Sequence, residues 1–548
     1  MNRTVTQPFI GSWRLVRLAL RRDRIILPVW IVAISGLAGA VLASYSGTYT
    51  NEAERADAAA FGASNPMTRV FDGPASGTSL GAMALVEAFK VLAILTALMS
   101  AQAVIRHTRA DEETGRAELL GSAVVGRHAR LTAALVVTLG ADLVLGVAVA
   151  GLLVANDLPV AGSFAAGMAA AGMGWVFAGI AAIGAQVLST TRGANAATAA
   201  ALAIAFVIRA VGDLLGHVGD SGVVLISAWP SWVSPLGWGQ QVRPYYQDNW
   251  WIAGLFAGLT ALLVAGAFRL TSLRDVGSGM VPPRPGSAHA GRGLRSTLGL
   301  AWRLQRGVLL VWAIGLVGLA AAFGAVGKSA EDLLTDNAQV AQMFARLSPG
   351  ADVIDVYFTV LMAIVGTAAA GYTVQALLRM RAEEDTGRLE PVLATPVGRH
   401  QWLASHAIIA AGGTTAILAL AGLAGGLVYG GMAGEWAAST RDALAAALVQ
   451  APAALALGAL VLALFGLLPR ESGPLAWAAL AAALVMGQLG AMLDLPQWLL
   501  DVSPFTHVPR VPAEAFSATP VVWLLATTVA LGAVGFAAFR RRDLAIGA

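Results

Sequence analysis

The chain of 548 residues contains no cysteine, and only 12% of its residues are charged. The absence of cysteine excludes disulfide bonds, thiolate catalysis and cysteine-ligated metal sites. Seven scattered histidines show no HExxH or similar ligand spacing, so no metal site is predicted. Lysine is also scarce, with two residues against 34 arginines, and this bias does not indicate nucleic-acid binding.

Apolar residues dominate what is present: 57% of the chain is hydrophobic and its mean hydropathy is +0.69. Such a composition indicates an all-α polytopic membrane protein, because a soluble chain cannot bury so much apolar surface. A helix needs about 20 mainly apolar residues to cross a bilayer. Twelve segments meet this requirement, near residues 25–44, 83–105, 131–154, 165–188, 194–214, 250–268, 308–326, 354–378, 404–429, 443–468, 474–493 and 521–539.

Basic residues predict the orientation of these twelve spans. With an even number of spans both termini lie on one side, and that side carries 27 of the Lys and Arg residues against eight on the other. Positive charge gathers in cytoplasmic loops. We therefore expect a multi-pass protein of a bacterial plasma (inner) membrane with both termini in the cytoplasm.

The spans fall into two related halves. Residues Arg109 to His128 (RADEETGRAELLGSAVVGRH) recur as Arg381 to His400 (RAEEDTGRLEPVLATPVGRH) with eleven identities, and Arg274 with its neighbouring aspartate recurs at Arg542. The repeat predicts two pseudo-symmetric halves of six helices each, residues 1–269 and 299–548, in the same orientation. Residues 270–298, rich in Gly, Pro, Ser and Arg, are predicted to form a cytoplasmic linker.

The two repeated segments, residues 109–128 and 381–400, are here called the first and second charged loops. Each follows the second span of its half and crowds acids and bases into a short stretch at the membrane boundary. Basic residues alone would set the orientation, so the acids suggest a partner. Two other interpretations are a solvated loop folded by weak ion pairs and, less supported, a carboxylate active site, for which no nucleophile or ligand set is present.

We expect a short helix in each charged loop, beginning near Thr114 and Thr386. The acids would then lie in its first turn, where the helix dipole favours them. Leucines at 119 and 120, and at 389 and 393, would give this helix a small apolar face suited to a groove on another protein.

These loops resemble those of the membrane subunits of type-2 ABC exporters, in particular the duplicated twelve-span permeases of bacterial drug and polyketide-antibiotic efflux systems. The resemblance implies that each loop is a coupling helix docked on a separate ABC ATPase, expected as a homodimer. The matching residues would be Glu112, Glu113, Thr114, Gly115, Arg116, Glu118, Glu384, Asp385, Thr386, Gly387, Arg388 and Glu390. Leu119-Leu120 become Pro391-Val392 in the second copy, which predicts unequal docking.

An ATP-driven exporter must bind ATP, and the string AFGAVGKS at residues 322–329 fits a relaxed P-loop pattern. A P-loop follows a buried strand and opens a helix, whereas this string ends the seventh span on the outer side. We therefore predict that the chain is not an enzyme and binds no cofactor, and that ATP and Mg²⁺ bind to the partner subunit.

The cargo is not specified by any motif, but an apolar, uncharged pathway favours a lipophilic drug, antibiotic or lipid. The only weak candidates for the substrate pathway are Glu87 and Lys90, three residues apart on the second span, for which a local ion pair is the simpler interpretation. Two alternative functions stay open: an ion-gradient-driven secondary transporter, and a membrane enzyme acting on lipid substrates.

Overall fold

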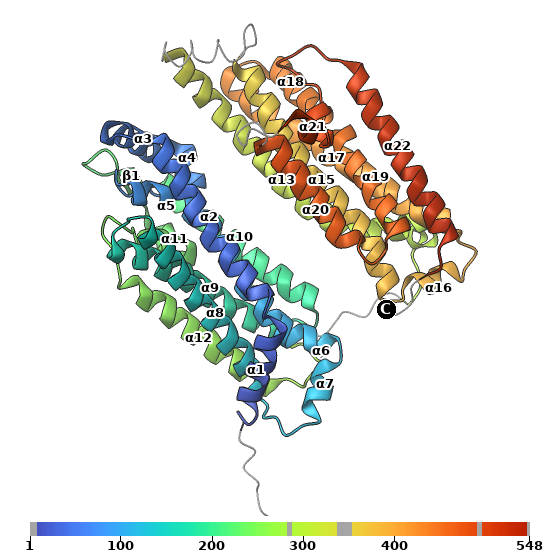
Figure 1. Ribbon diagram of the computed structural model, residues 1–548, viewed down its shortest axis with the longest axis horizontal. Helices are drawn as coiled ribbons and strands as arrows, with labels where there is room; N and C mark the ends of the chain where they lie inside the picture. The colour runs from blue at the N-terminus through green and yellow to red at the C-terminus, as the bar shows by residue number, and fades with distance from the viewer. Residues whose placement is uncertain (1–7, 282–287, 337–352, 490–495, 545–548) are drawn as a thin grey trace, which may run out of the picture. The chain divides into compact units, whose positions relative to one another are not determined.

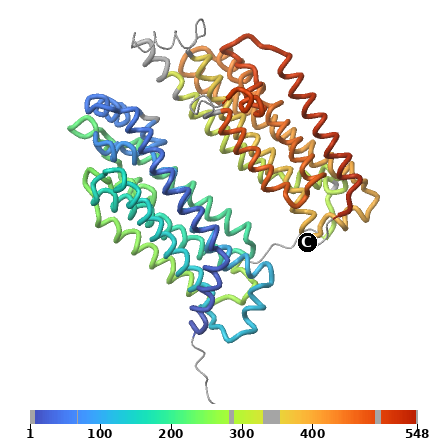
Figure 2. Tube along the Cα trace, viewed as in Figure 1, coloured from blue at the N-terminus to red at the C-terminus, as the bar shows by residue number. Residues whose placement is uncertain are grey.

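The computed structural model describes residues 8–281, 288–336, 353–489 and 496–544. The described chain is almost entirely helical and divides into two compact units, Met1–Pro285 and Gly286–Ala548 (Figures 1 and 2). The division falls inside the predicted linker 270–298. The expected all-α polytopic architecture is confirmed.

Unit 1 begins with a short helix, followed by long helices separated by compact loops. Its two-residue strands form a small antiparallel pair with His217 opposite Ile226. The elements are α1 (Ser12–Arg22), α2 (Ile26–Thr48), α3 (Glu52–Ser64), α4 (Pro66–Phe71), α5 (Leu80–Ile105), the π-helical turn η1 (Arg106–Ala110), α6 (Asp111–Glu113), α7 (Arg116–Gly121), α8 (Ala129–Ala155), α9 (Val160–Val187), α10 (Thr191–Leu214), β1 (His217–Val218), β2 (Leu225–Ile226), η2 (Trp229–Val233), α11 (Pro235–Gln241) and α12 (Ile252–Leu273).

Unit 2 repeats the long-helix pattern with one helix broken in the middle. The predicted tenth span is divided into α18 and α19, with Pro452 in the first turn after the break. The elements are η3 (Arg292–Arg295), α13 (Thr297–Asp336), α15 (Val353–Asp385), α16 (Leu389–Leu393), α17 (Arg399–Ala433), α18 (Trp436–Leu448), α19 (Ala451–Leu467), α20 (Ser472–Leu484), η4 (Val485–Leu489), α21 (Gln497–Leu500), η5 (Pro504–His507) and α22 (Ala518–Arg541).

Eleven helical segments in the described ranges are long and apolar enough to cross a membrane. They coincide with eleven of the twelve predicted spans. The remaining prediction, 474–493, corresponds to a shorter apolar helix, Ser472–Gly487, and its end reaches residues outside the described part of the chain. The polytopic prediction is thus confirmed, while the count of twelve stays a prediction.

Helix α9 is the centre of unit 1 and packs against α5, α8, α10 and α12. It approaches α8 closely because glycines face each other across the contact: a Cβ on Gly167 would stand 2.2 Å from the carbonyl oxygen of Gly146. Small residues allow such close packing where lipid supplies no hydrophobic drive for association. Larger apolar side chains point outward, including Val32 at 70% exposure, as expected of a lipid-facing surface.

Unit 2 has two packed groups of helices joined through α15. Helix α17 lies against α13, α15 and α18, and α19 lies against α15, α20 and α22. In unit 1, α6 and α7 lie at the end away from α3, α4 and β1, so the first charged loop emerges at one end of its bundle (Figure 1).

The beginning of the predicted linker is attached to unit 1. The backbone N–H groups of Met280 and Val281 donate to the carbonyls of Gln186 and Val187, at 3.3 and 3.0 Å. Residues 275–281 therefore run back along the end of α9 rather than leaving the bundle directly after α12.

Candidate functional site

The two charged loops fold in the same way where they leave the second span. The Thr114 N–H donates to the Ala110 carbonyl at 3.0 Å, and the Thr386 N–H donates to the Ala382 carbonyl at 3.2 Å. The next residues, Gly115 and Gly387, have φ values of +73° and +68°, which only glycine adopts without strain. The repeated Thr-Gly pair is therefore a helix stop.

Short helices follow, as expected, but they begin later than predicted, at Arg116 in α7 and Leu389 in α16. Most of the acids consequently belong to the last turn of the preceding span, and only Glu118 and Glu390 lie in the first turn of the short helices. Carboxylates near a helix C-terminus are disfavoured by the helix dipole. These carboxylates must therefore be stabilised by nearby cationic side chains.

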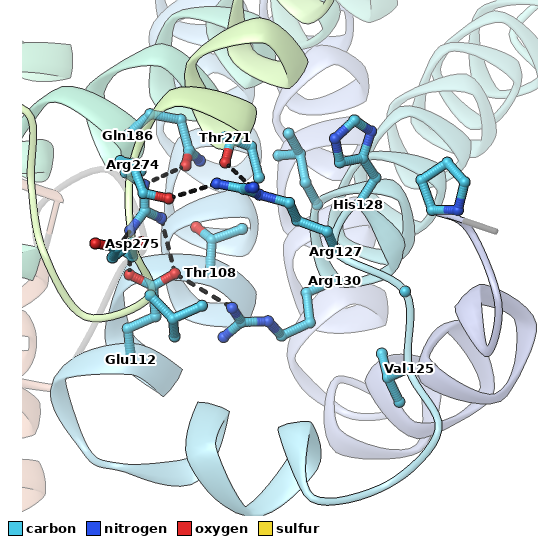
Figure 3. A pocket seen from close by; sticks show the side chains of 14 residues that line it. Thr108, Glu112, Val125, Arg127, His128, Arg130, Gln186, Thr271, Arg274 and Asp275 are labelled. Carbon is cyan, nitrogen blue, oxygen red and sulfur yellow. Dashed lines mark hydrogen bonds and ion pairs between the residues drawn. The ribbon is translucent and has the colours of Figure 1, made fainter. Parts of the chain in front are cut away.

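Glu112 is enclosed by arginines. Its carboxylate oxygens lie 2.7 and 2.9 Å from the guanidinium of Arg274 and 3.7 Å from Arg130 (Figure 3). They also lie 2.8 Å from Arg109, and the Glu112 side chain is 4% exposed. Arg274 follows α12, so the pair ties the cytoplasmic end predicted for the second span to that of the sixth. Bidentate arginine–carboxylate pairs are strong and geometrically specific.

The second half repeats this link. Glu384, with a 2% exposed side chain, accepts two hydrogen bonds of 2.7 Å from Arg542, which follows α22. Arg127 and Arg399 strengthen the same junction by donating to the carbonyls of Arg274 and Arg542 at 2.8 and 2.6 Å. The sequence repeat already marked Arg274 and Arg542, but nothing in the sequence assigned them as partners of the glutamates.

The first acid of each loop also forms an ion pair with an arginine of its own unit. Asp111 binds Arg22 of α1 at 2.8 Å and lies 4.0 Å from Arg116. In the second loop, Glu383 binds Arg379 at 2.6 Å and lies 3.9 Å from Arg388. Arg116 and Arg388 keep more than 60% of their side-chain surface exposed, so both remain accessible.

Glu113 and Asp385 stand on the exposed side, yet each has one local contact. The Glu113 carboxylate accepts from the backbone N–H of Thr191 at 2.9 Å, at the start of α10, and Asp385 pairs with Arg381 at 2.6 Å. The predicted coupling residues thus divide into a buried pair, two glycines and an exposed set. The exposed set is Glu113, Thr114, Arg116, Glu118, Asp385, Thr386, Arg388 and Glu390.

The expected apolar face of the short helices is present in the first half only. Leu119 is 76% exposed and Leu120 is partly exposed. Leu389, in contrast, is 2% exposed in the core of unit 2, and Leu393 packs against the same core. The prediction of an exposed apolar face was wrong for these two leucines. Leu389 stands where the first half has Ala117, and its buried side chain holds α16 against unit 2.

Asp23, between α1 and α2, was not identified from the sequence. It is 1% exposed and its carboxylate oxygens lie 2.6 Å from Arg106 and 2.7 Å from His107. Burial acts to raise the pKa of Asp23, but the hydrogen bonds and charges of His107 and Arg106 outweigh it and hold the pKa below its ordinary value. Asp23 and Asp111 together connect α1 to the charged turn that follows α5.

Glu87 and Lys90 form the local ion pair that was the simpler interpretation, at 2.8 Å. Lys90 also binds Asp72, which lies before α5. Burial raises the pKa of Asp72, Lys90 counteracts that shift, and Glu87 adds to it. The three side chains lie at the end of unit 1 opposite the charged loop, and their contacts are those of a structural cluster.

Asp142 is a buried acid inside a span that was not identified from the sequence. Asp142, in α8, is fully buried, lies 2.6 Å from the Ser100 hydroxyl, and its Oδ2 has no hydrogen-bond partner among the described residues. The sequence could have indicated it, because Asp142 is an acid within an apolar span, and such an acid is a functional candidate by default. Elsewhere, within the described ranges, no three His, Asp or Glu side chains gather as a metal site would require.

The P-loop-like string at 322–329 lies inside α13 and follows no strand, so it has the wrong local structure for binding a nucleotide phosphate.

Apolar helices in two related halves, each with a charged loop closed by the same Glu–Arg pair, define a polytopic membrane protein with an internal repeat. Residues 294–540 match the family model described as "Multidrug efflux system permease Rv1217c, C-terminal domain". The chain is 40% identical to the multidrug efflux system permease protein Rv1217c of Mycobacterium tuberculosis over 539 residues, covering 98% of this chain and 96% of that protein. The chain belongs to this family of multidrug efflux permeases.

Proposed function

We propose that this permease is the membrane subunit of an ATP-driven ABC exporter that moves lipophilic compounds outward, and that the two charged loops dock on a separate ATPase. The observation that carries the proposal is the duplicated exposed set, because both halves present two acids, a threonine and an arginine beside a buried Glu–Arg pair. A rigid anchor below an exposed polar surface suits a loop that transmits movement from a partner.

In this proposal the termini and both loops lie in the cytoplasm of a bacterium, and ATP with Mg²⁺ binds between two copies of the partner ATPase. A closing movement of those copies would press on α7 and α16. The Glu112–Arg274 and Glu384–Arg542 pairs would pass that displacement to the second and sixth spans of each half, because each pair joins the ends of those two helices.

The test uses Glu118 and Glu390, which are exposed on α7 and α16. The double variant Glu118→Lys/Glu390→Lys reverses charge on both predicted docking surfaces, so we expect loss of co-purification with the ABC ATPase and of substrate-stimulated ATP hydrolysis. Glu471→Lys is the matched control, since Glu471 is an exposed acid in another loop of the same predicted side. Normal binding and hydrolysis in the double variant would refute the proposal.

Asp142 gives the ion-gradient alternative one specific observation, since secondary transporters use buried acids of this kind for ion coupling. Reconstituted permease without any ATPase distinguishes the two functions. Export that follows an imposed proton gradient and is lost in Asp142→Asn would favour the alternative, whereas export that requires both ATPase and ATP supports the ABC mechanism.

A further inference from the structure

A polar cavity of about 550 Å³ opens beside the first charged loop. It lies between the beginning of α8 and the ends of α9 and α12 (Figure 3), and Pro8 is among its lining residues. Its basic lining side chains are Arg127, His128, Arg130 and Arg274, and its acidic ones are Glu112 and Asp275. The negative charge of Glu112 is already balanced by its ion pairs with Arg274 and Arg109. The other lining side chains therefore leave the cavity with an excess of positive charge.

The corresponding place in unit 2 is occupied by aromatic rings. Counting from the shared Val-Gly-Arg-His sequence, Arg130 corresponds to Trp402, and counting from Arg274 and Arg542, Thr271 corresponds to Phe539. Trp402 and Phe539 are 2% and 1% exposed with ring centroids 5.7 Å apart. Two halves with the same Glu–Arg link therefore differ at this place: the first has a cavity where the second has packed aromatic side chains.

The cavity contains a buried donor without an acceptor. Nη1 of Arg130 is buried and has no hydrogen-bond partner among the described residues, while its Nη2 is 3.7 Å from Glu112. A buried guanidinium N–H left unpaired costs free energy, so this position favours an acceptor brought by a ligand. His128 also lines the cavity, and its ring is held by a 3.0 Å contact between Nε2 and the Ser272 hydroxyl.

Arg127 and Arg274 set the geometry around that donor. Arg127 uses Nε and Nη2 on the carbonyls of Thr271 and Arg274, at 3.0 and 2.8 Å, and Figure 3 shows its guanidinium held against the end of α12. Arg274 is fixed by Glu112 and by Gln186 at 2.7 Å. The arginines are thus held in place before any ligand arrives, which lowers the ordering cost of binding.

We propose that this cavity binds a phosphate group, with Arg130 as the principal contact. Arginine guanidinium groups recognise phosphate oxygens through charge-assisted hydrogen bonds. Because α8 and α12 are membrane-spanning candidates that end here, the cavity lies where an anionic phospholipid headgroup would be, although a free phosphate has the same chemistry. The proposal concerns unit 1 alone and does not depend on an ATPase partner.

The test measures binding of phosphatidylglycerol and of inorganic phosphate to the purified full-length permease, by native mass spectrometry and by the shift of the unfolding temperature. Arg130→Trp places the residue of the second half into the first and should fill the cavity. We expect it to weaken phosphatidylglycerol binding about tenfold or more, with Arg130→Gln as a smaller change that leaves the cavity open. Phosphatidylcholine, also a phosphodiester but without net charge, is the reference lipid.

Arg269→Ala is the matched control: Arg269 is an exposed arginine on α12 that does not line the cavity, so its loss should change affinity less than twofold. Preference for the lipid assigns a headgroup, and equally tight binding of inorganic phosphate assigns a free phosphate. Unchanged lipid and phosphate binding in both Arg130 variants overturns the proposal. It is also overturned if both variants lose only ATPase association, because the cavity then receives a protein side chain.

Discussion

At the scale of single residues, the central feature is a carboxylate enclosed by arginine in each half. Glu112 and Glu384 were predicted as contact residues for a partner, and the structure places both inside the protein instead, bound to Arg274 and Arg542. Removing one member of a buried ion pair is costly because the other charge stays buried and unpaired. In the proposed mechanism these two glutamates would therefore hold the charged loops in shape and would not contact the proposed ATPase themselves.

This yields a stability prediction for the second half. Glu384→Gln leaves Arg542 without its bidentate acceptor, so we expect the free energy of unfolding to fall by about 3–5 kcal/mol. The measurement is a thermal or denaturant unfolding curve in detergent. Glu390→Gln, at an exposed position of the same loop, should change the value by less than about 0.5 kcal/mol.

A double-mutant cycle isolates the pair. Combining Glu384→Gln with Arg542→Gln should cost clearly less than the sum of the two single changes, since the second substitution removes the unpaired charge that the first creates. Strictly additive losses would contradict a direct interaction.

Sequence reasoning could find the charged residues but not their partners. The repeat placed Arg274 and Arg542 at equivalent positions, yet the contact to Glu112 joins residues 162 positions apart. Only the packing of the second span and of α12 on α9 brings the two residues together. Asp23 was missed for a similar reason: a single aspartate among arginines resembles a membrane flank, and its burial against His107 depends on how α1 folds back.

At the scale of elements, the long spans were predictable because about 20 apolar residues in lipid leave few alternatives to a helix. The charged turns were less so. Carboxylates were assigned to the start of α7 and α16 by their preference for helix N-termini, whereas the Thr-Gly stop comes after them and leaves them at the end of the preceding helix. Arginines such as Arg274 and Arg542 offset the unfavourable interaction between these carboxylates and the helix dipole. A prediction from helix-end preferences alone did not include them.

The glycine stops give the element-scale prediction. Gly115→Ala and Gly387→Ala should each destabilise the protein by about 1–2 kcal/mol, because a left-handed φ is unfavourable for alanine. No atom lies within 4 Å of a Cβ added at either glycine, so the cost is one of backbone conformation. The measurement is again the unfolding free energy.

Gly121 in α7 is the control for this pair. A Cβ there also meets nothing within 4 Å, and its backbone is helical, so Gly121→Ala should be neutral or stabilising by up to about 1 kcal/mol. Equal losses at Gly115 and Gly121 would show that the positive φ is not the cause.

At the scale of the whole molecule, the two halves are alike in charge order and unlike in their apolar contacts. Leu119 is 76% exposed on α7, while its counterpart is Pro391 and the neighbouring Leu389 is buried. If the loops dock on two copies of an ATPase, the first loop offers an apolar contact that the second lacks. The repeat predicts two similar halves, but this inequality between them follows only from knowing which leucines are buried.

The whole-molecule prediction compares the two docking surfaces. Leu119→Asp should weaken association with the ABC ATPase about tenfold or more, since burial of a leucine contributes about 1.5–3 kcal/mol. Pro391→Asp should weaken it less than threefold. The measurement is ATPase affinity by titration in nanodiscs, and equal effects of the two substitutions would contradict unequal docking.

The difference between Arg130 and Trp402 has a consequence for the engineering of the chain. The first half has a hollow lined by arginines beside its Glu–Arg link, whereas indole and phenyl rings fill the equivalent place in the second half. A chimera made of two second halves would retain both links and both loops, yet would have no equivalent of the arginine-lined hollow. The halves are therefore repeats in architecture, and only the first would bring this arginine-lined hollow to a chimera.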